Sequence, residues 1–194
     1  MDLVLIRHPA VAVEAGVCYG RSDVPLAAPA EAGARTMRER LAALGAPLPA
    51  QVWTSPLTRC ASVAERLAHA FDVPLRRDAG WQEMDFGAWE LQRWDDIDRA
   101  ALDAWAADLM HACAHGGESV AQFVERVARV AGEVAQADAP QWAITHAGVI
   151  RAFASHALRV PLDTLLSRPV PTSGVVWLRM EDAARTWEVV HWDA

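Results

Sequence analysis

The sequence predicts an α/β fold: a three-layer, doubly wound, mostly parallel sheet with mixed edges and with helices on both faces. Short apolar runs, typical of strands buried on both sides, alternate along the chain with longer stretches whose apolar residues recur at helical spacing. Such alternation favours βαβ units and a parallel sheet. The chain has 194 residues, enough for a full core, and we expect residues 1–194 to form a single domain.

Six segments are predicted to be strands. The first, residues 3–6, reads Leu-Val-Leu-Ile and is apolar throughout, as expected for a strand covered by helices on both faces. The last two follow each other closely, with a turn expected near residues 181–185. The predicted strands are residues 3–6, 51–54, 73–77, 142–145, 174–180 and 186–192.

Five segments are predicted to be helices, and two of them carry a start signal. Ser55 suits an N-cap and Pro56 the first helical position. Ser119, with Gln122 three residues later, resembles a capping box. The predicted helices are residues 31–44, 55–71, 96–110, 119–136 and 148–158, and residues 9–29 and 81–94 are expected to be irregular.

The charged residues exclude several function classes. The net charge of −7 disfavours general nucleic-acid binding, so any bound anion needs a local cluster of positive groups. All 18 basic residues are arginine, and the absence of lysine excludes Schiff-base chemistry and a P-loop lysine.

Cysteine usage and hydropathy bear on the compartment. Three widely spaced cysteines argue against a disulfide scaffold and for a reducing environment. No apolar run approaches the roughly 20 residues of a membrane span, and the N-terminus lacks the basic region of a signal peptide. We expect a cytoplasmic protein with no membrane or nucleic-acid partner, and a homodimer is compatible with the sequence.

Two histidines follow predicted strands directly, and two arginines stand close to them. His8 follows the first strand and His146 the fourth, and ligands of open α/β sheets gather at the carboxyl ends of strands. Arg7 adjoins His8, and Arg59 lies in the first turn of a helix, where the N-terminal N–H groups favour anions. Either histidine alone would more often be structural, but the joint arrangement predicts a phosphate pocket without metal.

These residues belong to five ordered blocks that resemble the signature of the histidine phosphatase superfamily, the phosphoglycerate-mutase-like fold. The blocks are Leu5-Ile6-Arg7-His8-Pro9, Ser55-Pro56-Leu57-Thr58-Arg59-Cys60-Ala61, Glu83-Met84-Asp85-Phe86-Gly87-Ala88-Trp89-Glu90, Gly117-Glu118-Ser119 and Thr145-His146-Ala147-Gly148. Residues 17–26 and 83–89 look most like the alpha-ribazole phosphatase branch. The chain departs from the common pattern at Leu91, where glycine is usual, and at Pro9 and Ala10.

The resemblance implies a role for each site residue. His8 would be the nucleophile, forming a phosphohistidine that water hydrolyses, and it has to be neutral to attack. Glu83 would protonate the leaving alkoxide and later activate water, with Asp85 as the rival acid. The phosphate or the rest of the substrate would contact Arg7, Arg59, His146 and the backbone N–H of Ala147, together with Arg21 and Ser22, which alternatively only form a turn. No cofactor is implied.

A metal site is the alternative chemistry. His111, Cys113 and His115 lie in the run His-Ala-Cys-Ala-His, with the two histidines at i and i+4. No third ligand is obvious, because Cys113 would point to another face of a helix. We therefore expect no metal.

For the aromatic and sulfur side chains near the predicted site, a structural role is the alternative to a functional one. Most of the nine tryptophans are expected in the core or at its rim. Trp81, Trp89 and Trp94 flank the proposed acid, so one of them covering an aromatic base of the substrate is a further hypothesis. Cys18 and Cys60 lie near the pocket segments and are expected to be bystanders.

The favoured function is a metal-independent phosphomonoesterase. The resemblance implies a small-molecule substrate, alpha-ribazole 5′-phosphate or adenosylcobalamin 5′-phosphate, in cobalamin biosynthesis. Two alternatives stay open: a broad-specificity or other small-molecule phosphatase of the same family, and a catalytically silent protein that binds a phospho-ligand. The presence of His8 together with an acid candidate counts against the silent protein.

Overall fold

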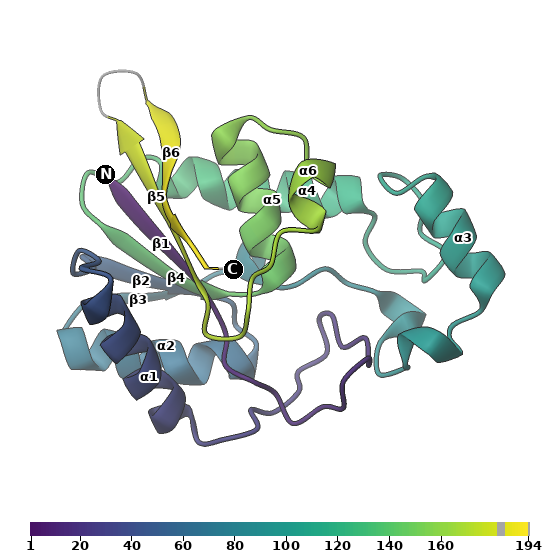
Figure 1. The fold of residues 1–194 in the computed structure, drawn as a ribbon, viewed down its shortest axis with the longest axis horizontal. Coiled ribbons are helices and arrows are strands. Elements are labelled where there is room, and N and C mark those ends of the chain that lie inside the picture. The colour runs from purple at the N-terminus through teal and green to yellow at the C-terminus, as the bar shows by residue number, and fades with distance from the viewer. Residues whose placement is uncertain (182–184, 194) are drawn as a thin grey trace.

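A single six-stranded sheet forms the centre of the computed structural model, which describes residues 1–181 and 185–193 (Figure 1). The strands are β1 (Asp2–Arg7), β2 (Gln51–Thr54), β3 (Leu75–Arg77), β4 (Gln141–Thr145), β5 (Val175–Glu181) and β6 (Thr186–Trp192). Their order is β3-β2-β4-β1-β5-β6, with the first four parallel and with β5 and β6 antiparallel to their neighbours. This confirms the mostly parallel sheet with a mixed edge. Of the turn predicted near residues 181–185, residues 182–184 lie outside the described residues.

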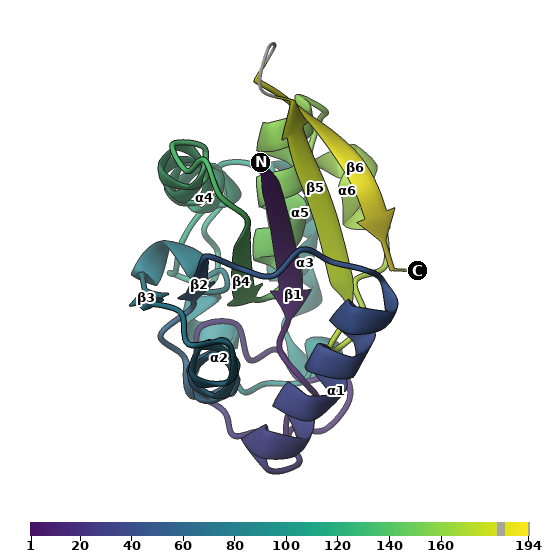
Figure 2. The ribbon, with the colours of Figure 1, turned by 90° about the vertical axis from the view of Figure 1, so that its left-hand side faces the viewer.

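Helices cover both faces of the sheet, so the expected three layers are present (Figures 1 and 2). One face packs against α1 (Ala30–Ala43) and α2 (Thr58–Phe71), and the other against α4 (Val120–Val134) and α5 (Ala147–Leu158), with the short α6 (Asp163–Leu166) beside α5. Of the described helices, none is both long enough and apolar enough to cross a membrane.

The apolar run of β1 divides between the two sides of the sheet. Leu3 and Leu5 pack with α4 and α5, whereas Val4 and Ile6 pack with α1 and α2. All four side chains are fully buried. Because successive strand residues point to opposite faces, a strand between two helical layers has to be apolar at every position.

The two helix starts expected from capping signals have different outcomes. At α4, Ser119 Oγ accepts from the N–H of Gln122 at 3.2 Å and Gln122 Oε1 accepts from the N–H of Ser119 at 2.9 Å, which confirms the capping box. At α2 the prediction is wrong: the helix begins at Thr58 instead of Ser55. The N–H and hydroxyl of Thr58 donate to the carboxylate of Asp23, each at 2.7 Å, so the capping side chain comes from a distant loop.

The helix expected over residues 96–110 is shorter in the structure. After a 3-10 turn at Trp94–Asp96, α3 spans Arg99–Ala107, and Asp98 caps it by accepting from the N–H of Ala101 at 3.0 Å. Figure 1 shows α3 at the side of the molecule, away from the sheet. Residues 108–119 lie outside any helix, so the helical spacing assumed for His111 and His115 is absent.

Candidate active site

His8 and His146 lie side by side because they follow two adjacent parallel strands. The register of β1 and β4 pairs Arg7 with Thr145, which are the last residues of the two strands. The N–H of His8 extends this ladder by donating to the carbonyl of Thr145 at 2.9 Å. The two imidazole rings then meet edge to face, with centroids 5.2 Å apart. The crevice expected from the sequence is therefore a direct result of strand register.

His8 is held as a neutral imidazole whose Nε2 has no hydrogen-bond partner among the described residues. Its Nδ1 lies 2.7 Å from the carbonyl oxygen of Pro9, which can only accept, so Nδ1 carries the proton and Nε2 keeps its lone pair. Burial lowers the pKa of His8 to about 3; the bond to Pro9 opposes this shift, and the charges of Arg59 and Arg7 add to it. Near neutral pH the ring is therefore unprotonated, so protonation does not block nucleophilic attack by this side chain.

A buried hydroxyl group and a buried thiol group contact His146. Its Nε2 lies 2.9 Å from Ser55 Oγ and 3.5 Å from Cys60 Sγ. Burial, and next the proximity of His8, lower the pKa of His146 well below its usual value, while burial raises the pKa of the Cys60 thiol. Ser55 thus supports the second histidine instead of capping α2, and Cys60 packs there as a neutral thiol.

The two predicted arginines bring positive charge to the crevice, with Arg59 buried and Arg7 half-buried. Arg59 is fully buried and donates to the carbonyls of Ser22 and Gly20, both at 2.6 Å, with its guanidinium 5.1 Å from the ring centre of Tyr19. Arg7 donates to the carbonyl of Val170 at 2.7 Å. Within the described part of the chain, the buried Nε–H groups of both arginines have no acceptor. Buried donors without partners are costly, which is consistent with an anion as the missing acceptor.

Glu83 and Asp85, the rival acids, have different surroundings. Glu83 Oε2 accepts from the N–H of Gly148 in the first turn of α5 at 3.0 Å, and Glu83 lines the same cavity as Arg7 and His8. A Cβ at position 148 would collide with Glu83 Oε1, so the close approach requires glycine. Asp85 instead pairs with Arg21 at 3.1 Å and accepts from the N–H of Gly87 at 2.8 Å, and it does not line the cavity.

The cavity beside His8 has a volume of ≈ 380 Å³ and mostly apolar walls. Its polar lining includes Arg7, His8, Glu83 and Arg151, and it is also lined by Ala147 and Gly148 from the first turn of α5. Its apolar lining consists mainly of Val17, Cys18, Tyr19, Met84, Phe86, Trp94, Trp105, Leu109, Val120, Phe123, Leu162 and Leu166. Burial raises the pKa of the Cys18 thiol to about 12, so this wall is uncharged.

Of the tryptophans near Glu83, some line the cavity and others pack in the core. Trp94 lines the cavity, as does Trp105 of α3, which the sequence interpretation had not singled out. Trp81 stacks on Phe153 in the core, and Trp89 packs against His115. For Trp81 and Trp89 the hypothesis of a substrate contact was therefore wrong.

Arg21 and Ser22 lie in a loop that hydrogen bonds to Glu90 hold in place. The Glu90 carboxylate accepts from the N–H of Arg21 at 2.9 Å, from the N–H of Ser22 at 2.7 Å and from the Ser22 hydroxyl. Neither side chain lines the cavity, so their contact with substrate stays a prediction. Glu90 had no assigned role, and its place in one of the family-like blocks was its only signal.

The residues considered for a metal lie in different surroundings. His115 is buried, accepts through Nδ1 from the N–H of Gly117 at 3.0 Å and packs on Trp89, whereas Cys113 is exposed. No group of three or more His, Cys, Asp or Glu side chains among the described residues is arranged to hold a metal ion.

The model of the histidine phosphatase superfamily (branch 1) matches residues 3–194. The chain belongs to this superfamily. This histidine phosphatase is 29% identical, over 171 residues, to the adenosylcobalamin/alpha-ribazole phosphatase of Salmonella typhimurium. The match covers 85% of this chain and 83% of that protein.

Solved phosphatase structures share its fold. The alpha-ribazole phosphatase from Shigella flexneri superposes with a TM-score of 0.86 at 22% identity, over 100% of this chain and 96% of that one. A mycobacterial glucosyl-3-phosphoglycerate phosphatase gives a TM-score of 0.82 at 22% identity, over 100% and 98%. At these identities the likeness concerns the fold alone, and it confirms the predicted phosphoglycerate-mutase-like architecture.

Proposed function

We propose that the protein is a metal-independent phosphomonoesterase that forms a phosphohistidine on His8 and acts on alpha-ribazole 5′-phosphate. The observation that carries the proposal is the neutral His8, whose Nε2 is free beside a cavity that Arg7 and Glu83 also line. The two unsatisfied Nε–H groups of Arg7 and Arg59 support a bound phosphate.

The reaction proceeds in two steps. His8 Nε2 attacks phosphorus and the bond to the ester oxygen breaks, while Glu83 gives that oxygen its proton. Arg7 and Arg59 stabilise the charge that develops on the phosphoryl oxygens, and His146 donates a hydrogen bond to them. Water, deprotonated by Glu83, then attacks the phosphohistidine, and inorganic phosphate leaves with His8 restored.

The apolar part of the cavity supports an aromatic leaving group. Alpha-ribazole carries a benzimidazole-type base on its ribose, and Trp94, Trp105 and Phe86 offer ring surfaces to such a base. The volume of ≈ 380 Å³ matches sites for small molecules, so adenosylcobalamin 5′-phosphate would have to leave most of its corrin ring outside. The name of the Salmonella relative also points to this substrate pair.

Arg151 favours a second candidate, an acidic sugar phosphate. Its side chain lines the cavity, where a carboxylate on the leaving group would meet its charge. One structural neighbour is named for a substrate of this class, glucosyl-3-phosphoglycerate.

Relative kcat/KM over a panel of esters tests both candidates. We expect alpha-ribazole 5′-phosphate to exceed 3-phosphoglycerate and p-nitrophenyl phosphate, with Arg151→Met changing the order little. A preference for the acidic ester that Arg151→Met abolishes would establish the second candidate. Absence of turnover on any phosphomonoester would exclude both.

A further inference from the structure

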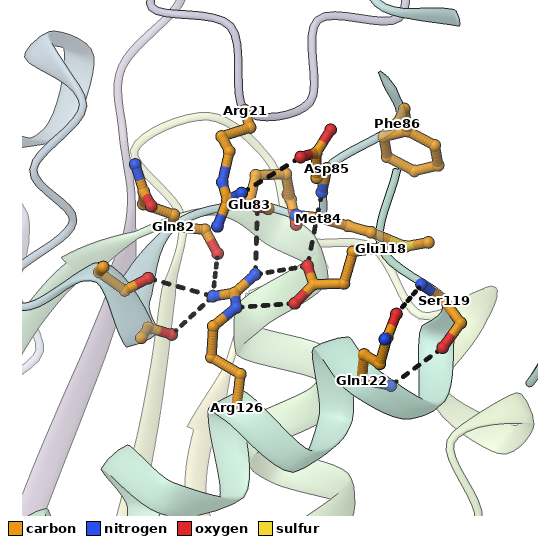
Figure 3. A network of polar contacts seen from close by, with 12 residues as sticks. Arg21, Gln82, Glu83, Met84, Asp85, Phe86, Glu118, Ser119, Gln122 and Arg126 are labelled. Carbon is orange, nitrogen blue, oxygen red and sulfur yellow. Dashed lines mark hydrogen bonds and ion pairs between the residues drawn. The ribbon is translucent and has the colours of Figure 1, made fainter. Parts of the chain in front are cut away.

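Arg126 of α4 reaches under the segment that carries the proposed acid (Figure 3). Its side chain is only 16% exposed, and that of its partner Glu118 is 13% exposed. The guanidinium donates to four backbone carbonyls: Ala79 at 3.2 Å, Gly80 at 3.0 Å, Gln82 at 2.9 Å and Glu83 at 3.3 Å. One side chain thus gathers the carbonyls on the N-terminal side of Met84, including that of the acid itself.

Glu118 completes this support from the other direction. Its carboxylate accepts from Arg126 Nε at 2.9 Å and from Nη2 at 2.7 Å, a bidentate pair that fixes the plane of the guanidinium. The same carboxylate accepts from the N–H of Asp85 at 3.5 Å, and the backbone N–H of Glu118 donates to the carbonyl of Asp85 at 2.9 Å. Residues on both sides of Glu83 are therefore bound to one ion pair, as Figure 3 shows.

No regular element holds this stretch. Residues 82–86 lie outside the helices and strands, between the 3-10 turns Ala79–Trp81 and Gly87–Trp89. The Glu83 carboxyl nevertheless has to stay close to the first turn of α5 and to His8. In the absence of a strand or helix, the bonds from Arg126 and Glu118 supply that constraint.

We propose that Arg126, oriented by Glu118, is the positioning residue for the Glu83 carboxyl, holding it where it reaches the ester oxygen of the substrate. This inference rests on the proposed role of Glu83 as proton donor. It goes beyond that role by assigning a purpose to the Gly117-Glu118-Ser119 block. A displacement of about 1 Å in a catalytic group costs on the order of 10²-fold in rate, so a positioning device has a measurable kinetic effect.

Leaving-group dependence separates positioning from general structural support. An alkyl ester such as 2-phenylethyl phosphate needs a proton on its poor leaving group, whereas p-nitrophenyl phosphate releases a stabilised anion. The charge of Arg126 also contributes to lowering the pKa of His146, but an effect through His146 or through partial unfolding reduces turnover of both esters alike. The ratio of the two rates therefore reports on the proton donor alone.

Single-turnover phosphorylation of Arg126→Met should fall by about 10- to 100-fold with the alkyl ester and by no more than about threefold with the aryl ester. Arg126→Lys keeps the charge but not the fork, so it should show the same selective loss to a smaller extent, and it serves if the methionine variant does not fold. Arg129→Met is the matched control. Arg129 lies on the same helix, and its ion pairs are with Asp78 and Glu133, so the ratio should not change.

Glu83→Gln provides the reference for the same ratio, and the double variant Glu83→Gln/Arg126→Met closes the cycle. With the proton donor removed, Arg126→Met should add no further selective loss on the alkyl ester. If Glu83→Gln shows no selectivity, the proposed acid role is wrong and the inference falls with it. If Glu83→Gln is selective but Arg126→Met and Arg126→Lys lower both esters equally, the acid role stands and the positioning role is overturned.

Discussion

The strand ends that carry His8 and His146 differ from the irregular segment that carries Glu83 in what holds their backbone. His8 continues the ladder between β1 and β4 through main-chain hydrogen bonds. Glu83 lies between 3-10 turns and depends on the side chains of Arg126 and Glu118. The proposed nucleophile is thus placed by main-chain bonds that every residue except proline can make, whereas the proposed acid is placed by particular charged side chains. We expect substitutions outside the site to disturb the acid more readily than the nucleophile.

The largest effect is expected at the strand end itself. His8→Ala should lower turnover on the order of 10⁴- to 10⁶-fold, because it removes the atom that forms the covalent intermediate. The ladder around it involves only the backbone, so the far-ultraviolet circular dichroism of the variant should match that of the wild type. Acid-labile phosphate should be trapped on the wild type and be absent from the variant, whereas phosphate on serine or aspartate would contradict the mechanism.

At the irregular segment, replacing the acid should have a smaller and substrate-dependent effect. Glu83→Gln should slow phosphoryl transfer from a ribose 5′-ester by roughly 10²- to 10⁴-fold, and distinctly less from an aryl ester, in single-turnover experiments. Asp85→Asn is the control, because Asp85 pairs with Arg21 and does not line the cavity. If the selective loss appears with Asp85→Asn instead, the proton donor has been assigned to the wrong carboxyl.

The strand end should also make the stability of the protein sensitive to acid. The pKa of His8 in the folded protein is about 3, below its usual value of 6.5, so the unfolded chain binds the proton more readily than the folded protein. Stability from the neutral imidazole is complete above the unfolded pKa and is lost as the pH falls toward the folded one, by about 1.4 kcal/mol per pH unit for one such group. The unfolding free energy, measured by urea denaturation between pH 7 and pH 4, should therefore fall less steeply for His8→Gln than for the wild type. Parallel curves for the two proteins would show that His8 is not held neutral by the fold.

Local pattern accounts for the parts of the fold and the site that could be predicted. Apolar runs mark the strands, and parallel register brings the residue after each strand to one edge, so His8 and His146 were placed together. The cap of α2 by Asp23 and the bonds of Glu90 to the loop at Ser22 join residues far apart in the sequence. Such contacts leave no periodicity, and the prediction of Ser55 as the N-cap was wrong for this reason.

The same limit applies to the irregular segment. Neither helical nor strand spacing indicates which of its side chains face the cavity. Trp94 lines the cavity, whereas Trp81 and Trp89 pack in the core, and composition treats all three alike. The reach of Arg126 to the carbonyls of the segment was hidden in the same way, because it depends on how α4 packs against a loop.

The smallest effect is expected at Leu91, where the irregular segment is strained. Leu91 has a φ of 65° and is 62% exposed, so the residue takes on left-handed backbone strain while burying only a minor part of its surface. Its N–H donates to the carbonyl of Cys18 at 2.6 Å, a bond that glycine would keep. Leu91→Gly relieves roughly 1 kcal/mol of strain. Because glycine also raises the conformational entropy of the unfolded chain, part of this gain is offset, and the net increase in unfolding free energy should be about 0.5 kcal/mol.

Leu48→Gly is the matched control for this last change, because Leu48 is also exposed, at 70%, and does not have a positive φ. There glycine brings only the entropic cost, and stability should fall by about 0.5 to 1 kcal/mol. Urea denaturation of the two variants should therefore move in opposite directions. If Leu91→Gly is destabilising as well, the leucine makes contacts that outweigh its strain, and the segment beside Glu90 is packed more firmly than its exposure indicates.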